Sequence, residues 1–144
     1  MSSISAALTQ DHRHCDEVFA RAEEHVAHGD WTQAEREFSG YLAAMEKHFH
    51  FEEDNLFPAF EQASGSRAGP TQIMRMEHEQ MRALFRDLET GLRNRDAGRY
   101  LGLSETLLVL MQQHNMKEEH ILYRLAERAL GPAGEALAAR LARA

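Results

Sequence analysis

The stretch HFHFEEDNLFP, at positions 48–58, decides the fold expected for this chain. It places His48 and Glu52 four residues apart, so on a helix both side chains would share one face. A second stretch, HNMKEEHILY at positions 114–123, repeats that spacing 66 positions later. A single histidine precedes each stretch by 36 positions. The offset therefore relates His12, His48 and Glu52 to His78, His114 and Glu118, which predicts two copies of one helical unit.

The 66-residue offset also holds for residues outside these stretches. It relates Phe19 to Phe85, Asp30 to Asp96 and Gly65 to Gly131. Apolar periodicity predicts long helices over about 5–28, from the Gly29-Asp30 break to about 63, over about 71–92 and from the 96–98 break to about 129, and a short one over about 133–143. The breaks between them fall at Gly29-Asp30, at 64–70, at 96–98 and at Gly131-Pro132. Pro58 lies inside the second helix, where it should remove a hydrogen bond and bend the helix.

These helices predict an all-α protein with a single domain over residues 1–144. The expected fold is an up-down-up-down four-helix bundle of two pseudo-symmetric helical hairpins, with its core over about 5–130. The short C-terminal helix is expected to dock on the bundle or on a neighbouring subunit, as in a homodimer.

Helix geometry predicts that the four repeated histidines lie in one layer of this bundle. His12 and His48 each fall roughly 25–27 Å from the turn that joins their helices, at 1.5 Å of rise per residue. His78 and His114 repeat this arithmetic in the second hairpin. Glu52 and Glu118 should stand one turn further along, on the same faces.

Each of the six residues replaces an apolar residue on the inward stripe of its helix. On the last long helix that stripe is predicted to be Leu108, Met111, His114, Glu118, Leu122 and Leu125. Six buried titratable groups are costly without a partner, and a pair of divalent cations would supply one. Imidazole and carboxylate suit iron, zinc and manganese. Two carboxylates, two histidines per iron and one oxide or hydroxide bridge would leave an octahedral position open for a small ligand.

Other polar residues near these positions have more ordinary interpretations. Glu53 and Glu119 directly follow the predicted ligands and would replace them if the helices rotated slightly. The remaining histidines fall mostly off the apolar stripes and are expected to be solvated or to lie behind the ligands: His14, His25, His28, His50 and His120. Cys15 is the single cysteine, which excludes an internal disulfide, and it is expected to be a small buried residue.

Composition argues against several classes of function. The net charge of −7, without a basic stripe, disfavours nucleic-acid binding. No apolar run approaches the roughly 18 residues needed to cross a bilayer. The first residues lack the basic and apolar regions of a signal peptide, so a cytoplasmic location is expected. No glutamate has a histidine three residues later, which disfavours a ferritin-like carboxylate bundle.

The chain resembles the hemerythrin-like (HHE cation-binding) domain family over about residues 5–130. The segments that carry this resemblance are DHRHCD at 11–16, HFHFEEDNLFP at 48–58, EHEQM at 77–81 and HNMKEEHILY at 114–123. The resemblance implies an up-down four-helix bundle with a non-haem di-iron centre, in proteins that bind or sense oxygen, sense iron, respond to nitric oxide or help to repair iron centres. Oxygen carriers of the family have a histidine where this chain has Arg82, and an aspartate five residues after the last histidine. The set of four histidines and two glutamates is closer to that of the iron-centre repair proteins, and it gives no obvious distinction between two metal positions.

Three functions are therefore expected in different classes. The first is a cytoplasmic di-iron protein that binds dioxygen, nitric oxide or peroxide in sensing, stress defence or iron handling and repair. The second is a di-iron enzyme with peroxidase, oxidase or nitric-oxide-reducing turnover, although no glycine-rich loop or nucleophile elbow indicates an organic substrate. The third is a metal-stabilised structural or signalling module whose C-terminal helix contacts a protein partner.

Overall fold

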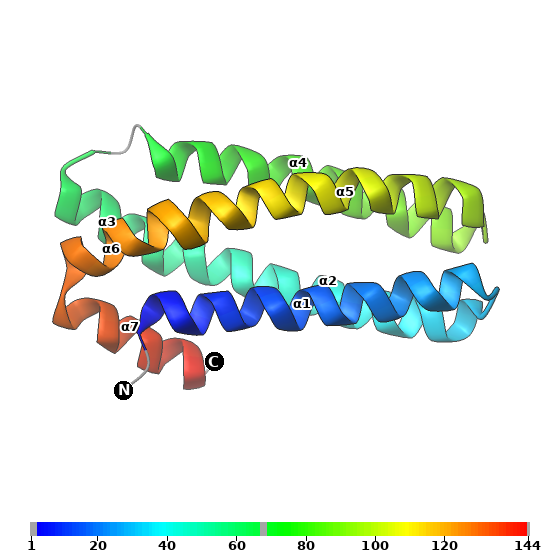
Figure 1. Cartoon of the computed structure of the whole chain (residues 1–144), viewed down its shortest axis with the longest axis horizontal. Helices are drawn as coiled ribbons and strands as arrows, with labels where there is room; N and C mark the ends of the chain where they lie inside the picture. The colour runs from blue at the N-terminus through cyan, green and yellow to red at the C-terminus, as the bar shows by residue number, and fades with distance from the viewer. Residues whose placement is uncertain (1–2, 67–68, 144) are drawn as a thin grey trace.

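Four long helical segments run along the longest axis of the molecule, as Figure 1 shows for the computed structural model. It describes residues 3–66 and 69–143, and within them the regular structure is helical without strands. The first hairpin pairs α1 (Ile4–Ala27) with α2 (Trp31–Phe51), and the second pairs α4 (Pro70–Arg93) with α5 (Ala97–Lys117). The predicted all-α four-helix bundle of two helical hairpins is confirmed.

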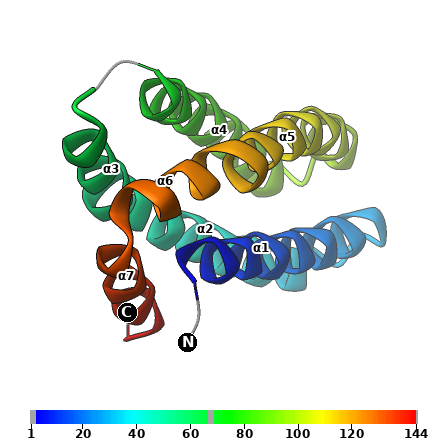
Figure 2. The same cartoon turned by 60° about the vertical axis from the view of Figure 1, so that its left-hand side comes forward.

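The second and fourth segments each continue through a short π-helical turn. After α2 come η1 (Glu52–Leu56) and α3 (Phe57–Ser64), and after α5 come η2 (Glu118–Leu122) and α6 (Tyr123–Leu130). Figure 2 shows that α3 and α6 meet at one end of the bundle. The final helix, α7 (Pro132–Arg143), packs there against α1 and α6, so the C-terminal helix docks on its own bundle.

The two hairpin turns have the same backbone geometry. Gly29 has a φ of 73°, and Arg95, which lies 66 positions later, has a φ of 50°. The Asp30 N–H donates to the His25 carbonyl at 2.9 Å, and the Asp96 N–H donates to Gly91 at 2.9 Å. The repeat in the sequence is therefore a repeat in structure, even where the second copy has an arginine at the left-handed position that favours glycine.

The break predicted at 64–70 separates the hairpins. Gly65 ends α3 with a φ of 75°, and α4 begins at Pro70, where proline suits the first turn of a helix. Residues 67 and 68 of this break lie outside the described part of the chain.

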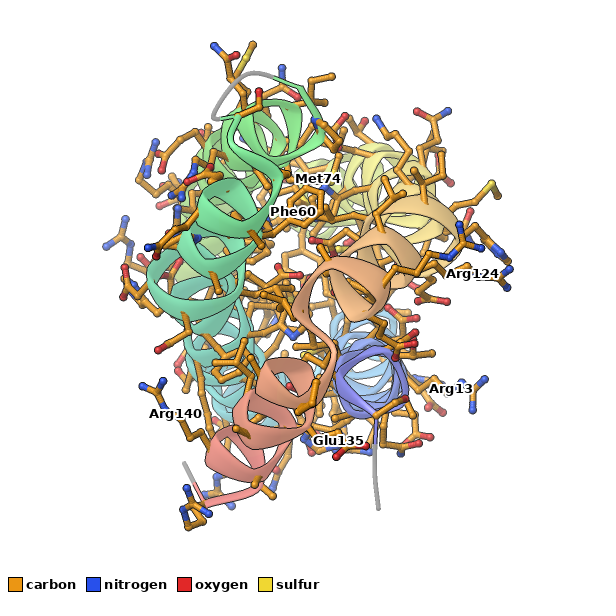
Figure 3. The ribbon with its side chains drawn as sticks, turned by 90° about the vertical axis from the view of Figure 1, so that its left-hand side faces the viewer. Arg13, Phe60, Met74, Arg124, Glu135 and Arg140 are labelled. Atoms are coloured by element: carbon orange, nitrogen blue, oxygen red, sulfur yellow. The ribbon has the colours of Figure 1, made fainter. Side chains whose placement is uncertain are left out.

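The core consists of two apolar clusters with the histidine layer between them. On α1, Leu8 belongs to the cluster near the chain ends and Cys15 to the other, with His12 between. On α4, Met74 and Met81 flank His78 in the same way. Phe60 and Met74, labelled in Figure 3, lie together in the cluster near the chain ends. Apolar packing thus closes the polar layer on both sides.

Two positions of the predicted stripe on the last long segment are wrong. Leu108 and Leu125 are 44% and 39% exposed, whereas Leu107 and Ala126 are buried. The π-helical turn explains Leu125, because one extra residue per turn rotates every later residue about the helix axis. Leu108 lies before that turn. Leu107 and Leu108 are adjacent leucines, so apolar periodicity alone does not show which of them faces inward.

None of the helices in the described ranges is long and apolar enough to cross a membrane.

Candidate metal centre

The six predicted ligands come together in the buried layer between the two apolar clusters. All six side chains are at most 4% exposed. Their potential donor atoms form two groups of four, and within each group the atoms lie within 4.8 Å of one another. One group contains His12 and His48, the other contains His78 and His114, and both contain Glu52 and Glu118.

Each glutamate connects the two hairpins. Glu52 Oε1 lies 3.4 Å from Nε2 of His48 on its own segment and 3.2 Å from Nε2 of His78 on α4. Glu118 Oε1 lies 3.2 Å from Nε2 of His114 and 3.1 Å from Nε2 of His12 on α1. Both carboxylates therefore lie between the histidine pairs, as carboxylates that bridge two cations would.

The two π-helical turns begin at these glutamates. The Phe57 N–H donates to the Glu52 carbonyl and the Tyr123 N–H donates to the Glu118 carbonyl, five residues back in each case. Pro58 accompanies the first turn, but Arg124 occupies the matching position in the second, so the turns follow the buried glutamates and not the proline. π-helical turns of this kind are common at functional sites.

Pro58 lies in the first turn of α3 and has no N–H to donate. The carbonyl of Glu53, five residues earlier, accepts a hydrogen bond of 3.3 Å from Nη1 of Arg75 on α4.

In every histidine of the cluster, the outer ring nitrogen, Nδ1, forms a hydrogen bond with a carboxylate. Nδ1 of His12 lies 2.7 Å from Glu119 and Nδ1 of His78 lies 2.7 Å from Glu53. Nδ1 of His48 lies 3.3 Å from Asp11, and Nδ1 of His114 lies 2.8 Å from Glu77. This arrangement fixes each ring with its Nε2 toward the cluster, as carboxylates behind metal-binding histidines do.

Glu53 and Glu119 thus lie behind the histidines and outside both groups of inward donor atoms. The sequence predicts Glu53 and Glu119 only as substitute ligands, and it does not indicate a role for Asp11 or Glu77 in the site. The repeat could have found these residues, because the same offset of 66 relates Asp11 to Glu77 and Glu53 to Glu119.

Tyr123 is a further polar residue of the cluster that sequence reasoning did not identify. Its hydroxyl donates to Glu52 Oε2 at 2.6 Å and lies 3.0 Å from Glu118 Oε1 and 3.2 Å from His12 Nε2. The position 66 residues earlier is Phe57, which has no hydroxyl, so the repeat hides this contact. Tyr41, by contrast, packs against Phe19 and Phe85 in the apolar cluster.

The remaining histidines and the cysteine do not join the inward group. His50 is 62% exposed beside Glu46 and Asp54, and His25 lies 3.5 Å from Asp30 at the hairpin turn. His14, His28 and His120 are also exposed. Cys15 is buried, and burial together with Asp11 and Asp16 raises the pKa of its thiol to about 12.

The electrostatics of the layer favour positive charge between the glutamates. Burial opposes protonation of His48 and His78, but Glu52 and the other nearby carboxylates outweigh it and raise the two pKa values to about 10 and about 11. Burial also opposes ionisation of Glu118, but His114 and the other histidines hold the pKa of its carboxyl well below the usual range. Without a metal, protons on His48 and His78 supply positive charge beside the carboxylates.

Five potential ligand atoms of the layer nevertheless form no hydrogen bond of good geometry, although His48, His78 and His114 lie 3.2–3.4 Å from the glutamates. They are buried, and they are Nε2 of His48, His78 and His114, Oε1 of Glu52 and Oε2 of Glu118. Buried polar atoms without a hydrogen bond are rare in proteins, and here five belong to the two groups of potential ligands. Imidazole nitrogens and carboxylate oxygens in this arrangement fit divalent or trivalent ions of the first transition series.

Comparison with known proteins agrees with this geometry. The family model described as hemerythrin HHE cation binding domain matches residues 3–126. No significant match is found among curated proteins or among solved structures. The match spans all six inward residues, and together with the buried cluster it indicates a metal-binding site.

Proposed function

Since the chain belongs to the hemerythrin HHE cation-binding domain family, we propose that it is a non-haem di-iron protein that binds dioxygen, nitric oxide or peroxide. The role would be in sensing, stress defence or iron handling and iron-centre repair. The observation that carries the proposal is the set of five buried ligand atoms without hydrogen bonds, which belong to the residues of the two groups that share Glu52 and Glu118.

Some residues of this chain would bind the metal ions, and others would orient the histidine rings that bind them. His12 and His48 would hold one ion, His78 and His114 the other, and Glu52 and Glu118 would contact both. Asp11, Glu53, Glu77 and Glu119 would keep the imidazole rings oriented through Nδ1. Bound iron would supply redox chemistry and an open coordination position, which no side chain of the layer offers alone.

An apolar hollow beside the layer supports a small, weakly polar ligand. It lies between the start of α4 and η2, and Ile73, Met74, Ile121 and Leu122 contribute to its lining. Met74 and Leu122 are buried, one turn from His78 and from Glu118 respectively. Although Lys117 also contributes to the lining, the mainly apolar side chains favour dioxygen or nitric oxide over charged substrates.

The test is the metal content per chain, together with the absorption spectrum of protein expressed with iron and purified without chelators. Two irons and near-ultraviolet bands of bridged ferric iron are the expected result. Anaerobically reduced protein should then change its spectrum when dioxygen or nitric oxide is added. Zinc alone, or no metal after anaerobic reconstitution with iron, would overturn the proposal.

A di-iron enzyme is the alternative that the same experiment separates. Multiple turnovers of peroxide or nitric oxide per chain, at rates well above free iron, would assign the enzyme. Tight ligand binding without turnover would assign the binding protein.

A further inference from the structure

The cluster consists of two half-sites that look equivalent in the sequence. Half-site 1 contains His12 and His48, and half-site 2 contains His78 and His114. Glu52 and Glu118 are common to both, so any difference must come from the residues around the histidines. Tyr123 contacts both common glutamates, and its hydroxyl also lies 3.2 Å from Nε2 of His12, so it adds a polar group to half-site 1 as well.

Each carboxylate behind half-site 2 pairs with a cation, although Arg82 also pairs with Glu46 and Glu79. Glu53, which holds His78, also accepts from Arg82 Nη1 at 2.9 Å and from Arg82 Nη2 at 3.1 Å. Glu77, which holds His114, pairs with Lys117. Each of these carboxylates is thus shared between a histidine and a cation.

The carboxylates behind half-site 1 are paired differently. In the described ranges, Asp11 and Glu119 have no basic side chain within 4.0 Å other than the histidines they hold. Arg13 follows His12 in the sequence, but Figure 3 shows it pointing away from the bundle, as Arg124 does.

The repeat shows where the difference arises. The position 66 residues before Arg82 is Asp16, and the position 66 residues before Lys117 is Phe51. Half-site 1 thus has an acid and an apolar residue where half-site 2 has two cations.

A carboxylate that holds Nδ1 of a histidine makes the imidazole a stronger donor, and a competing cation weakens that effect. The negative charge around half-site 1 also attracts the more highly charged ion directly. We propose that the two half-sites are inequivalent, an inference that rests on the proposed metal centre. Half-site 1 prefers a trivalent ion such as ferric iron, and half-site 2 prefers a divalent ion.

The test places one trivalent and one divalent ion that do not change oxidation state. Metal-free protein is loaded with one equivalent of gallium(III), supplied as citrate, and one equivalent of zinc(II), and is crystallised. Anomalous diffraction at the two absorption edges then gives the occupancy of each element in each half-site. We expect gallium between His12 and His48 and zinc between His78 and His114. An even or reversed distribution would overturn the inference.

Two variants change the charge without changing a proposed ligand. Arg82→Gln removes a cation from half-site 2, and Asp16→Arg adds one beside half-site 1. Each should lower the ratio of gallium to zinc in half-site 1, on the order of tenfold for one unit charge several ångströms away in a partly buried site. Arg82→Lys should retain the wild-type ratio, because it keeps the charge.

The matched control is Arg21→Gln, which removes a cation that pairs with Glu37 on the surface at 3.3 Å. It should leave the distribution unchanged, and a shift as large as that of Arg82→Gln would contradict the assignment.

The proposed metal centre can fail separately. If neither ion binds, the centre itself is wrong, whereas two bound ions in an even distribution refute only the inequivalence.

Discussion

The hydroxyl of Tyr123 donates a hydrogen bond of 2.6 Å to Glu52, which lies 71 positions earlier in the chain and on the other hairpin. Both side chains are fully buried. The contact joins the end of the fourth segment to the end of the second, at the level where both contain a π-helical turn. The hairpins are thus connected through the polar layer as well as through apolar packing.

Replacement of Tyr123 by phenylalanine should therefore destabilise the metal-free protein. A buried carboxylate would lose its donor, at a cost of about 1–3 kcal/mol in the free energy of unfolding. Urea unfolding of metal-free protein measures this loss. Tyr41→Phe is the control, because Tyr41 is also buried but packs beside Phe19 and Phe85 in the apolar cluster, and it should change stability by less than about 0.5 kcal/mol. Equal losses in both variants would show that Tyr123 contributes only packing.

The proposed ligands can be tested one histidine at a time. His48→Ala or His114→Ala should abolish binding of both ions, because each half-site shares its glutamates with the other. Metal content after reconstitution measures the effect. His50→Ala and His120→Ala remove exposed histidines from the same segments and should retain full occupancy. Full occupancy in His48→Ala or His114→Ala would refute the shared arrangement.

The fold and the six inward residues could be predicted from spacing alone, because helical periodicity and a constant offset can be recognised in a sequence without knowing which residues are in contact. Tyr123 and Arg82 could not be found in this way. Their contacts run between hairpins and break the repeat, since the matching positions are Phe57 and Asp16. The π-helical turns could not be predicted from the sequence either, because the second turn has no proline to indicate it. Internal symmetry thus predicted what the halves share, and only the structure showed where they differ.

Cys15 is expected to be chemically inert. Burial, with Asp11 and Asp16, raises the pKa of its thiol to about 12, so little thiolate exists near neutral pH. Reaction with a thiol reagent should be slow in the native protein and fast after unfolding in denaturant. Cys15→Ala should retain the metal content of the wild type. Fast labelling of the native protein, or loss of metal in the variant, would point to a redox or ligand role.

The stability that metal provides should increase with pH. In the metal-free protein, burial opposes protonation of His48, but Glu52 and Asp11 outweigh it and raise its pKa from 6.5 to about 10. A raised pKa of this kind stabilises the fold fully below pH 6.5, and the contribution is lost as pH rises toward 10. Metal must displace the same protons, so its apparent affinity rises over that range. The melting temperature of metal-loaded protein should therefore exceed that of metal-free protein by a margin that widens between about pH 6 and pH 9. A margin that stays constant would mean that the histidines hold no protons to displace, and equal melting temperatures throughout would mean that the buried layer binds no metal.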